Sequence, residues 1–321
     1  MRLGLLSTAN INRMVIAGAR ASSDVEIVAV ASRDSARADA YAREHGIPRA
    51  HGSYEALLAD PGVEGIYISL PNSMHVDWSV QALEAGKHVL CEKPLSRRPI
   101  DVDRAFAAAE RSGRVLAEAF MYRHHPQTER VAELVRGGAI GELRTIRSAF
   151  SFPLADLENV RMQPDLDGGA LMDVGCYCVS GSRLLGGEPE RVWGEQVVAP
   201  TGVDTTFVAT LRFAGDVVAT FHASMSIPSR QELEVFGTEG TLLVQAPWRV
   251  DFGGDVLLTR DGAVEYVDVP EGDSYQLELD DFAAAARGEH APLLGRGDSL
   301  GQTRAIEALY RSADSGEPVS L

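Results

Sequence analysis

Along residues 1–122, short apolar segments alternate with helical patterns, and this alternation constrains the fold more than any other feature of the chain. Small polar residues and glycines stand where helices would begin and end, with Asp34, Ser53 and Ser73 as N-cap candidates. The expected strands are Leu3–Leu6, Glu26–Ala31, a short one near Ala50, Ile66–Leu70, His88–Cys91 and Val115–Ala117. Six such strands joined by crossover helices predict an α/β, Rossmann-like, doubly wound parallel sheet, and therefore a dinucleotide-binding domain over residues 1–122.

Residues 123–321 follow a different pattern, in which long segments alternate apolar and polar residues and are separated by turn signals such as Ala214-Gly215-Asp216. A helix is expected from Gly168 to Leu185, and two more over Leu277–Arg287 and Ser299–Ser315. The expected strands are Leu143–Phe152, Val192–Val198, Thr205–Phe213, Val217–Met225, Gln231–Phe236, Thr241–Val244 and Val256–Thr259. The pattern predicts an α+β domain with a large, mostly antiparallel open sheet, which would bind substrate and support oligomerisation.

Composition excludes several classes of protein. The net charge of −16 argues against nucleic acid or an anionic membrane as a partner. No apolar stretch reaches the ~18 residues that a membrane span needs, and the chain begins with a strand pattern rather than a signal peptide. Cys91, Cys176 and Cys178 form no metal-binding spacing, so we expect a reduced, cytoplasmic protein. His124 and His125 are adjacent and have no evident third ligand, so no metal is expected.

The loop after the first strand is a candidate pyrophosphate site. The fingerprint G-x-G-x-x-G would place glycines at positions 7, 9 and 12, where this chain has Ser7, Ala9 and Asn12. The first two are small enough to let backbone amides approach a phosphate, and the loop opens a helix N-terminus, where anions are favoured. An ordinary strand–helix turn is the alternative. The predicted contacts are Ser7, Thr8, Ala9, Asn10 and Ile11.

The end of the second strand indicates which dinucleotide is bound. An NAD site normally has a carboxylate there for the ribose hydroxyls, whereas this chain has Ser32 and Arg33, with Arg37 one helical turn later. Guanidinium groups match a 2′-phosphate, and Asp34 is better explained as a helix N-cap. We therefore expect NADP, with NAD possible, since an Arg33 that only stacks on adenine would be compatible with either cofactor.

Lys93 is the leading candidate for a reacting residue. Only two of the 30 basic residues are lysines, Lys87 and Lys93, and Lys93 follows the apolar run Val89-Leu90 at the expected end of a strand. Lysine is a compact charge whose pKa moves readily, while arginine keeps its proton. Ligands bind at the carboxyl ends of strands in open α/β sheets, which favours a catalytic lysine over a solvated loop residue.

Four segments together resemble the glucose–fructose oxidoreductase/inositol dehydrogenase (Gfo/Idh/MocA) family over essentially the whole chain. They are Leu70-Pro71-Asn72-Ser73-Met74-His75, Cys91-Glu92-Lys93-Pro94, residues 118–126, and residues 168–177 with Gly168-Gly169, Asp173 and Tyr177. Tyr177 stands where many members have histidine. In having tyrosine at this position, the chain resembles the branch of the family that contains dimeric dihydrodiol dehydrogenase, NADP-dependent D-xylose 1-dehydrogenase and some nucleotide-sugar ketoreductases.

The resemblance implies roles for individual residues. Lys93 would contact the reacting hydroxyl and the nicotinamide ribose, and Glu92 would line the nicotinamide pocket. Pro71, Asn72 and His75 would surround that ribose. Leu70 and Arg123, in the first and third of these segments, complete the expected cofactor-binding set.

Sugar oxidation needs a base for the hydroxyl proton, and Tyr177 is the candidate. Free tyrosine, with a pKa of ~10, is a poor base at neutral pH, but a lysine within ~4–6 Å would favour phenolate. Tyr177 lies four residues after Asp173, so on a helix both would face one way, with Asp173 binding a substrate hydroxyl. A half-buried structural tyrosine is the alternative.

The sequence thus predicts an NADP(H)-dependent oxidoreductase acting on a CH–OH group of a sugar or sugar-like polyol, with aldose C1 oxidation as the leading reaction. Reduction of a ketosugar, possibly nucleotide-linked, is the second reading. A non-catalytic cofactor-binding sensor and an NAD-dependent glycosidase are the others. We also expect a homodimer or homotetramer formed through the second sheet, with apolar residues at Phe207, Leu211, Phe221 and Val235.

Overall fold

The computed structural model describes residues 1–321, which form two compact units. One unit holds residues 1–124 and 272–300, and the other holds residues 125–271 and 301–321. Residues 272–300, which the sequence pattern grouped with the second domain, pack with the first unit. The division at residue 122 into a dinucleotide-binding and a substrate-binding domain stays a prediction about function.

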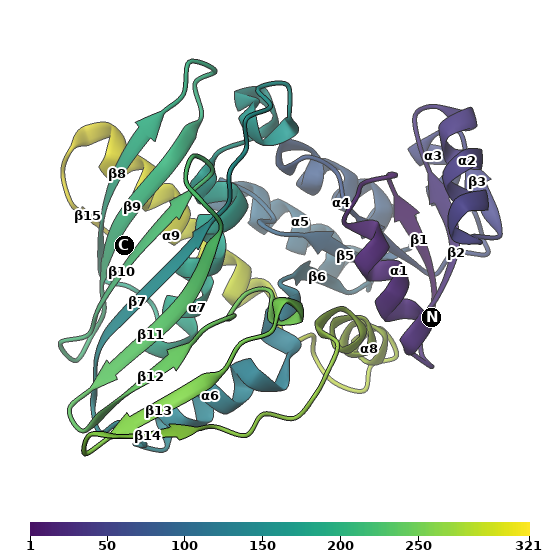
Figure 1. The fold of residues 1–321 in the computed structure, drawn as a ribbon. Helices are drawn as coiled ribbons and strands as arrows, with labels where there is room; N and C mark the ends of the chain where they lie inside the picture. Colours follow the sequence, from purple (N-terminus) through teal and green to yellow (C-terminus); the bar gives the residue numbers. More distant parts are fainter. The chain divides into compact units, whose positions relative to one another are not determined.

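The first unit contains a six-stranded parallel sheet in the order β3-β2-β1-β4-β5-β6 (Figure 1). This order confirms the predicted doubly wound fold. The order reverses between β1 and β4, so the carboxyl ends of these two strands flank the crevice in which such sheets bind ligands. The strands are β1 (Arg2–Leu6), β2 (Glu26–Ala31), β3 (Arg49–His51), β4 (Gly65–Ile68), β5 (His88–Glu92) and β6 (Leu116–Ala119).

Side-chain caps set where several helices of this unit begin. Asp34 accepts hydrogen bonds from two backbone N–H groups at the start of α2, and Ser53 accepts one, from the Ala56 N–H, at the start of α3. The N-cap expected at Ser73 is wrong, because Ser73 lies in a 3-10 turn and α4 starts two residues later without a side-chain cap. The helices are α1 (Asn12–Ala21), α2 (Ser35–His45), α3 (Tyr54–Leu58), α4 (His75–Glu84), α5 (Pro99–Ser112) and α8 (Ser274–Ala286), with 3-10 turns η1 (Asn72–Met74) and η2 (Met121–His124).

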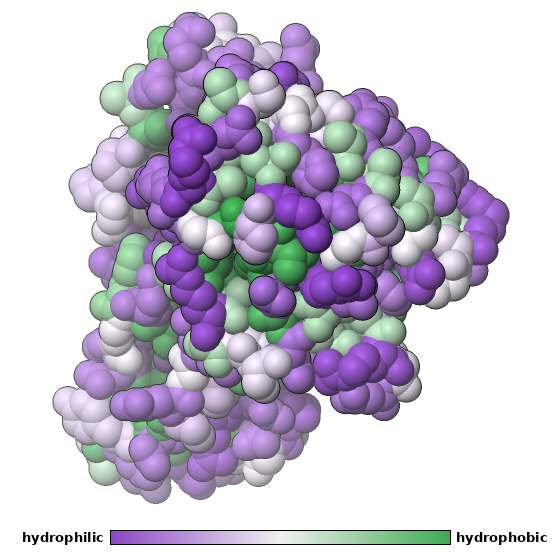
Figure 2. All heavy atoms as spheres, turned by 90° about the vertical axis from the view of Figure 1, so that its right-hand side faces the viewer, coloured by the Kyte–Doolittle hydropathy of each residue, from purple (hydrophilic) through white to green (hydrophobic).

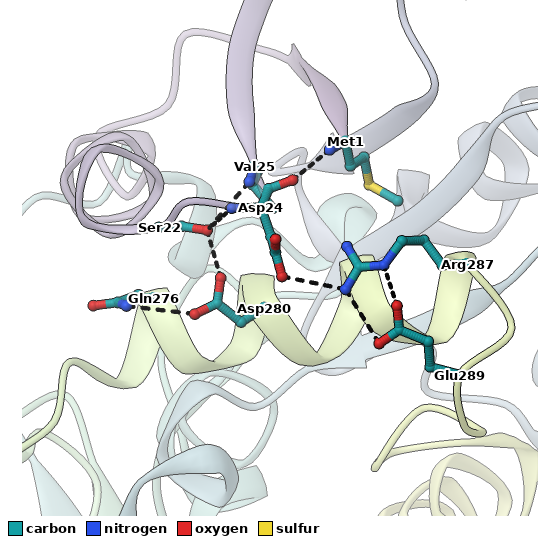
Figure 3. Close-up of polar contacts among 8 residues, drawn as sticks. All are labelled: Met1, Ser22, Asp24, Val25, Gln276, Asp280, Arg287 and Glu289. Carbon is teal, nitrogen blue, oxygen red and sulfur yellow. Dashed lines mark hydrogen bonds and ion pairs between the residues drawn. The ribbon is translucent and has the colours of Figure 1, made fainter.

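Helix α8 comes from the late part of the chain and packs against α1. A Cβ added at Gly18 of α1 would lie 2.7 Å from the backbone nitrogen of Gln276, so a residue without a side chain is needed at this crossing. Figure 3 shows polar contacts that fasten α8 to the turn before β2. Ser22 donates to Asp280, and Arg287 lies 3.2 Å from the carboxylate of Asp24.

The second unit is built on a nine-stranded sheet in the order β14-β13-β12-β11-β7-β10-β9-β8-β15. All neighbouring strands are antiparallel except β7 and β10, which confirms the expected mostly antiparallel α+β unit. The strands are β7 (Leu143–Ser151), β8 (Arg191–Val198), β9 (Asp204–Arg212), β10 (Val218–Ser224), β11 (Arg230–Gly237), β12 (Gly240–Val244), β13 (Val256–Arg260), β14 (Ala263–Tyr266) and β15 (Val319–Ser320).

The helices of this unit cover one face of the sheet, and the ring of Tyr310 packs on Phe207 with centroids 5.6 Å apart. The residues expected to mark the oligomer surface, Phe207, Leu211, Phe221 and Val235, are all buried. That expectation is corrected: these four side chains form the core, because their strand parity points them toward the helices. The helices are α6 (Pro126–Arg136), α7 (Cys176–Gly186) and α9 (Arg296–Ser315), whose first residues, 296–300, belong to the first unit. The shorter turns are η3 (Val160–Met162), η4 (Pro164–Leu166), η5 (Leu171–Gly175) and η6 (Val250–Phe252).

Hydrophilic side chains predominate on the molecular face in Figure 2, in keeping with a net charge of −16. None of the helices combines the length and the apolar character that crossing a membrane requires.

Candidate active site

Side chains replace glycine in the loop after β1. Ser7 has a φ of 152°, a conformation that favours glycine, and its hydroxyl accepts a hydrogen bond from the Ala9 N–H at 3.1 Å. Asn12 is fully buried and donates to the Ser7 carbonyl at 2.8 Å. Ser69, after β4, hydrogen-bonds to both residues: its hydroxyl lies 2.7 Å from the Ser7 hydroxyl and donates to the side-chain Oδ1 of Asn12 at 2.7 Å. Side-chain hydrogen bonds therefore shape a loop that glycines shape in the standard fingerprint.

The same loop leads into the N-terminus of helix α1. Helix α1 has no acidic residue in its first turn and no side-chain cap. The N–H groups of Asn12, Arg13 and Met14 donate to loop carbonyl oxygens, so an anion here would be favoured by the positive end of the helix dipole and not by free N–H groups of the first turn. Thr8, Ala9 and Ile11 are partly exposed and Asn10 is exposed. These residues fit the dinucleotide pyrophosphate that the sequence predicted for them.

The end of β2 presents two exposed arginines. Ser32 is buried and accepts from the Asp34 N–H at 3.3 Å, while Asp34 caps α2 as expected. Arg33 and Arg37 are exposed and form no ion pair. Their guanidinium groups are therefore available to a phosphate, and the nearest carboxylate in sequence is engaged with backbone N–H groups.

The buried side chain of His75 forms hydrogen bonds to two loops of the site. It is fully buried, with Nδ1 2.9 Å from the Pro94 carbonyl oxygen and Nε2 2.8 Å from the Leu70 carbonyl oxygen. Burial lowers the pKa of His75. The ring therefore ties the β4 loop, with Pro71 and Asn72, to the β5 loop, and it does not present a nitrogen for proton transfer.

Glu92 and Lys93 lie at the carboxyl end of β5, one strand away from the switch point. Tyr67, from β4, donates a hydrogen bond to Oε1 of Glu92, and the Lys93 N–H donates to Oε2 at 3.3 Å. The Lys93–Pro94 peptide bond is cis. Glu92 is thus held from two sides, next to a partly buried Lys93.

Glu118 supports this loop and was missed by sequence reasoning. It is buried on β6, and its carboxylate accepts from the Leu95 N–H at 2.8 Å. The acidic residue inside an otherwise apolar strand, Leu116-Ala117-Glu118-Ala119, was the signal that could have identified it.

Arg123, a predicted cofactor contact, lies in η2 with its side chain mostly buried. Its guanidinium forms an ion pair with Asp298 at 3.5 Å. The neighbouring His124 is also buried, and burial, with the charge of Arg123, lowers its pKa to about 3. Nowhere do three or more His, Cys, Asp or Glu side chains gather as a metal ion would need.

In the second unit, aromatic rings surround Tyr177. Its ring meets Phe150 edge-on with centroids 5.3 Å apart, and Trp248 lies 6.1 Å away. Trp248 is itself fixed by a hydrogen bond from Nε1 to the Ala149 carbonyl at 2.9 Å. Tyr177 is 6 % exposed, so its position is set by packing and not by solvent.

Asp173 lies one turn before Tyr177, in a segment that differs from the prediction. Residues Leu171–Gly175 form a π turn, and the regular helix α7 begins only at Cys176. The Asp173 carboxylate accepts from Nε of Arg161 at 2.8 Å. π turns inside helices often occur at functional sites, and Arg161 is a further residue that the sequence did not reveal.

Glycine is needed at positions 168 and 169 because other atoms of the protein lie where a Cβ atom would be. A Cβ at Gly168 would lie 2.4 Å from the Arg161 carbonyl oxygen, and one at Gly169, whose φ is +124°, would lie 2.1 Å from Oδ1 of Asp204. Asp204 is buried and accepts from the Leu171 N–H at 2.7 Å and from the Tyr310 hydroxyl at 2.8 Å. Asp204 therefore accepts a hydrogen bond from an N–H group at the start of the helical segment that carries Asp173 and Tyr177, where N–H groups have no partner within the helix.

In the first unit, the predicted cofactor residues lie at the side of the sheet where the parallel strands have their carboxyl ends. In the second unit, Asp173 and Tyr177 lie one helical turn apart. Lys93 and Tyr177 belong to different units, so their joint action stays a prediction.

Comparison with known proteins gives matches over both units. Residues 1–120 match the GFO/IDH/MocA oxidoreductase family with an NAD-binding Rossmann fold, and residues 128–243 match the GFO/IDH/MocA C-terminal domain.

Among the similar proteins are dehydrogenases and reductases. A D-xylose 1-dehydrogenase (NADP(+)) from Haloferax volcanii is 41% identical, with 100% of each chain covered. A dTDP-3,4-didehydro-2,6-dideoxy-alpha-D-glucose 3-reductase from Streptomyces violaceoruber is 36% identical, covering 89% of this chain and 85% of that one. A crystal structure of a 3-ketoreductase from Actinomadura kijaniata with NADP and TDP-benzene superposes with a TM-score of 0.91, at 30% identity and 97% coverage of both chains.

Proposed function

Because this chain belongs to the GFO/IDH/MocA family of oxidoreductases, we propose that it transfers a hydride between NADP(H) and a CH–OH group of a sugar or sugar-like polyol. Oxidation of an aldose at C1 is the leading reaction. The observation that carries the proposal is the placement of Glu92-Lys93-Pro94 at the carboxyl end of β5, beside the switch point of a doubly wound sheet.

The residues at the sheet edge fit NADP. The α1 N-terminus and the loop from Ser7 to Ile11 would hold the pyrophosphate, and Arg33 with Arg37 would hold the 2′-phosphate. When bound there, the nicotinamide supplies the hydride acceptor or donor. The NADP dependence of the 41% identical relative supports the same choice.

Proton transfer is assigned to Tyr177, with Lys93 favouring its phenolate form. Buried aromatic packing holds the Tyr177 ring in one orientation, which a base needs. Asp173 would accept a hydrogen bond from a second substrate hydroxyl, and it already accepts one from Nε of Arg161. Crystal structures of the 3-ketoreductase exist for one variant with a tyrosine replaced by phenylalanine and for another with a lysine replaced by alanine, the same two residue types that are proposed here.

The test is a substrate screen that follows NADP reduction spectrophotometrically with xylose, glucose and related aldoses. NADPH binding is measured in parallel by fluorescence. Turnover of an aldose with NADP supports the proposal. Tight NADPH binding without turnover of any sugar in either direction would instead identify a cofactor-binding sensor.

Reduction of a ketosugar is the second candidate, and the TM-score of 0.91 to a 3-ketoreductase favours it. The same assay in reverse, with NADPH and nucleotide-linked ketosugars, separates the two. Greater kcat/KM for the ketosugar than for every aldose would reverse the order of the candidates.

We also propose a homodimer or homotetramer formed through the uncovered face of the nine-stranded sheet. Trp193 on β8 and Val208 on β9 are each about half exposed there, on strand positions that alternate with the core residues. Trp193→Glu should lower the mass measured by light scattering at micromolar concentration. A wild-type mass near 34.5 kDa would contradict the proposal.

A cytoplasmic location completes the proposal. All three cysteines are buried free thiols, which a reducing compartment preserves.

A further inference from the structure

A chain of hydrogen bonds joins the carboxyl ends of β1 and β4, the two strands that flank the switch point. The register of this parallel pair ends with Leu6 beside Ile68, and Ser7 and Ser69 follow these residues on their strands. The two serine hydroxyl oxygens are 2.7 Å apart, and both residues are buried. The buried amide of Asn12, at the start of α1, bonds to both serines. These three polar residues form a brace within the first unit.

The contacts fix the direction of each hydrogen bond in the brace. The Asn12 amide donates through Nδ2 to the Ser7 carbonyl at 2.8 Å, so its Oδ1 is the acceptor for Ser69. The Ser69 hydroxyl has one proton, which it donates to that Oδ1 at 2.7 Å. The Ser7 hydroxyl therefore donates toward Ser69, and it accepts from the Ala9 N–H at 3.1 Å. The hydrogen bonds thus run in one sense from the Ala9 N–H to the Asn12 amide, and each one polarises the next.

Ser7 needs this support because its backbone conformation favours glycine. Its φ is 152°, a value that a residue with a Cβ adopts only when its surroundings hold it there. The Ser7 carbonyl is held by Asn12 and the Ser7 hydroxyl is held by Ser69. A glycine at position 7 would adopt the same conformation without the brace.

Ser69 is itself fixed by its chain neighbour. It precedes Leu70, whose carbonyl oxygen lies 2.8 Å from Nε2 of the buried His75. The other ring nitrogen of His75 lies 2.9 Å from the carbonyl oxygen of Pro94, in the loop after β5. The end of β4 is therefore tied to the neighbouring strand end, and a residue held in this way can set the position of its partners.

The brace also determines which N–H groups of the loop a phosphate can use. The Ala9 N–H is occupied by the Ser7 hydroxyl. The N–H groups of Thr8, Asn10 and Ile11 donate to no acceptor of the protein, so they are the ones that can donate to a pyrophosphate oxygen. Their directions follow from the backbone conformation that begins at Ser7.

We propose that Ser69 is a positioning residue for the dinucleotide, because its hydroxyl holds the loop after β1 in the conformation that binds the pyrophosphate. It acts through Ser7 and Asn12, and it replaces the conformational freedom that glycine gives this loop in the standard fingerprint. The inference rests on the NADP binding in the proposed function and not on the identity of the sugar.

Fluorescence titration of Ser69→Ala with NADPH and NADH tests this role. Alanine leaves the buried Oδ1 of Asn12 without a donor, so both dissociation constants should rise at least about fivefold. They should rise by the same factor, because both cofactors contain the pyrophosphate. Ser112→Ala, which removes a hydrogen-bonded hydroxyl at the end of α5, is the control and should change neither constant. Unchanged constants in Ser69→Ala would overturn the proposal.

A second pair of variants separates positioning from a general loss of stability. Glycine adopts the φ of position 7 without support, so Ser7→Gly should keep the NADPH dissociation constant within about threefold of wild type. Adding Ser69→Ala to Ser7→Gly should then raise that constant less than about twofold, because the two residues act together. An equal rise in both backgrounds would show that Ser69 does not act through Ser7, and the positioning role would be wrong.

Urea denaturation without cofactor shows whether each variant folds. If Ser69→Ala does not fold, the double variant Ser7→Gly/Ser69→Ala must still fold and bind NADPH, and its failure to do so counts against the proposal. Failure of the proposed sugar reaction would look different, since wild type would then bind NADPH without turning over a sugar. The comparison of dissociation constants is the same in that case. Wild type that bound neither NADPH nor NADH would contradict both.

Discussion

Ser7 and Asn12 each make hydrogen bonds that glycine could not, at positions where a dinucleotide loop ordinarily has glycine. Ser69, from the neighbouring strand end, links them. The sequence predicted the place of this loop from strand and helix patterns. It could not predict the bracing, because Ser69 lies 57 positions or more from its partners and nothing local indicates the pairing.

Arg33 carries the clearest prediction at this scale. Its exposed guanidinium follows β2, so Arg33→Ala should weaken NADP binding at least about tenfold, as expected for a lost charge-assisted hydrogen bond. NAD lacks the 2′-phosphate, so its dissociation constant should change little. The measurement is titration of both cofactors with both proteins. Tighter binding of NAD than NADP by wild type would refute the assignment.

At the scale of elements, the segment that carries Asp173 and Tyr177 depends on Asp204. Two buried hydrogen bonds converge on that carboxylate, one from the Leu171 N–H and one from Tyr310. Asp204→Ala should therefore lower the free energy of unfolding by about 2–4 kcal/mol, measured by urea denaturation. Asp255→Ala, at an exposed position of the same unit, is the control and should change it by less than about 0.5 kcal/mol.

Sequence patterns predicted most strands and helices but not the π turn or the place of α8. Apolar periodicity does not distinguish a five-residue turn at Leu171–Gly175 from the first turn of an α-helix. The assignment of residues 272–300 depended on contacts such as Gly18 with Gln276, far apart in the chain. Glycine inside helix α1, at position 18, and inside strand β4, at position 65, was the available signal for the place of α8.

For the whole molecule, buried ionisable groups predict a stability maximum with a loss on each side. The folded-state pKa of His124 is about 3, below its ordinary value, so the unfolded chain binds more protons and stability falls as pH drops from about 6.5 toward 3. Glu278 has a raised folded-state pKa, so its contribution is present at low pH and is lost as pH rises above about 4.3.

The free energy of unfolding, measured by urea denaturation at a series of pH values, checks both the acid loss and the alkaline loss. Each group contributes at most about 1.4 kcal/mol per pH unit. Glu278→Gln should remove the alkaline loss and be more stable than wild type at pH 8, while His124→Gln should flatten the acid limb. Parallel curves for wild type and Glu278→Gln would show that Glu278 does not titrate differently in the folded protein.

The central claim is that Lys93 and Tyr177 act as one proton-transfer unit in an NADP-dependent oxidation, and turnover of Lys93→Arg, Tyr177→Phe and the double variant tests it most directly. Each single change should lower kcat by about 10²–10⁴ on the best aldose, with NADPH binding retained. The double variant should be little worse, because residues that act together are not additive. Near wild-type kcat in Tyr177→Phe, at a pH where wild type is fully active, would contradict the account.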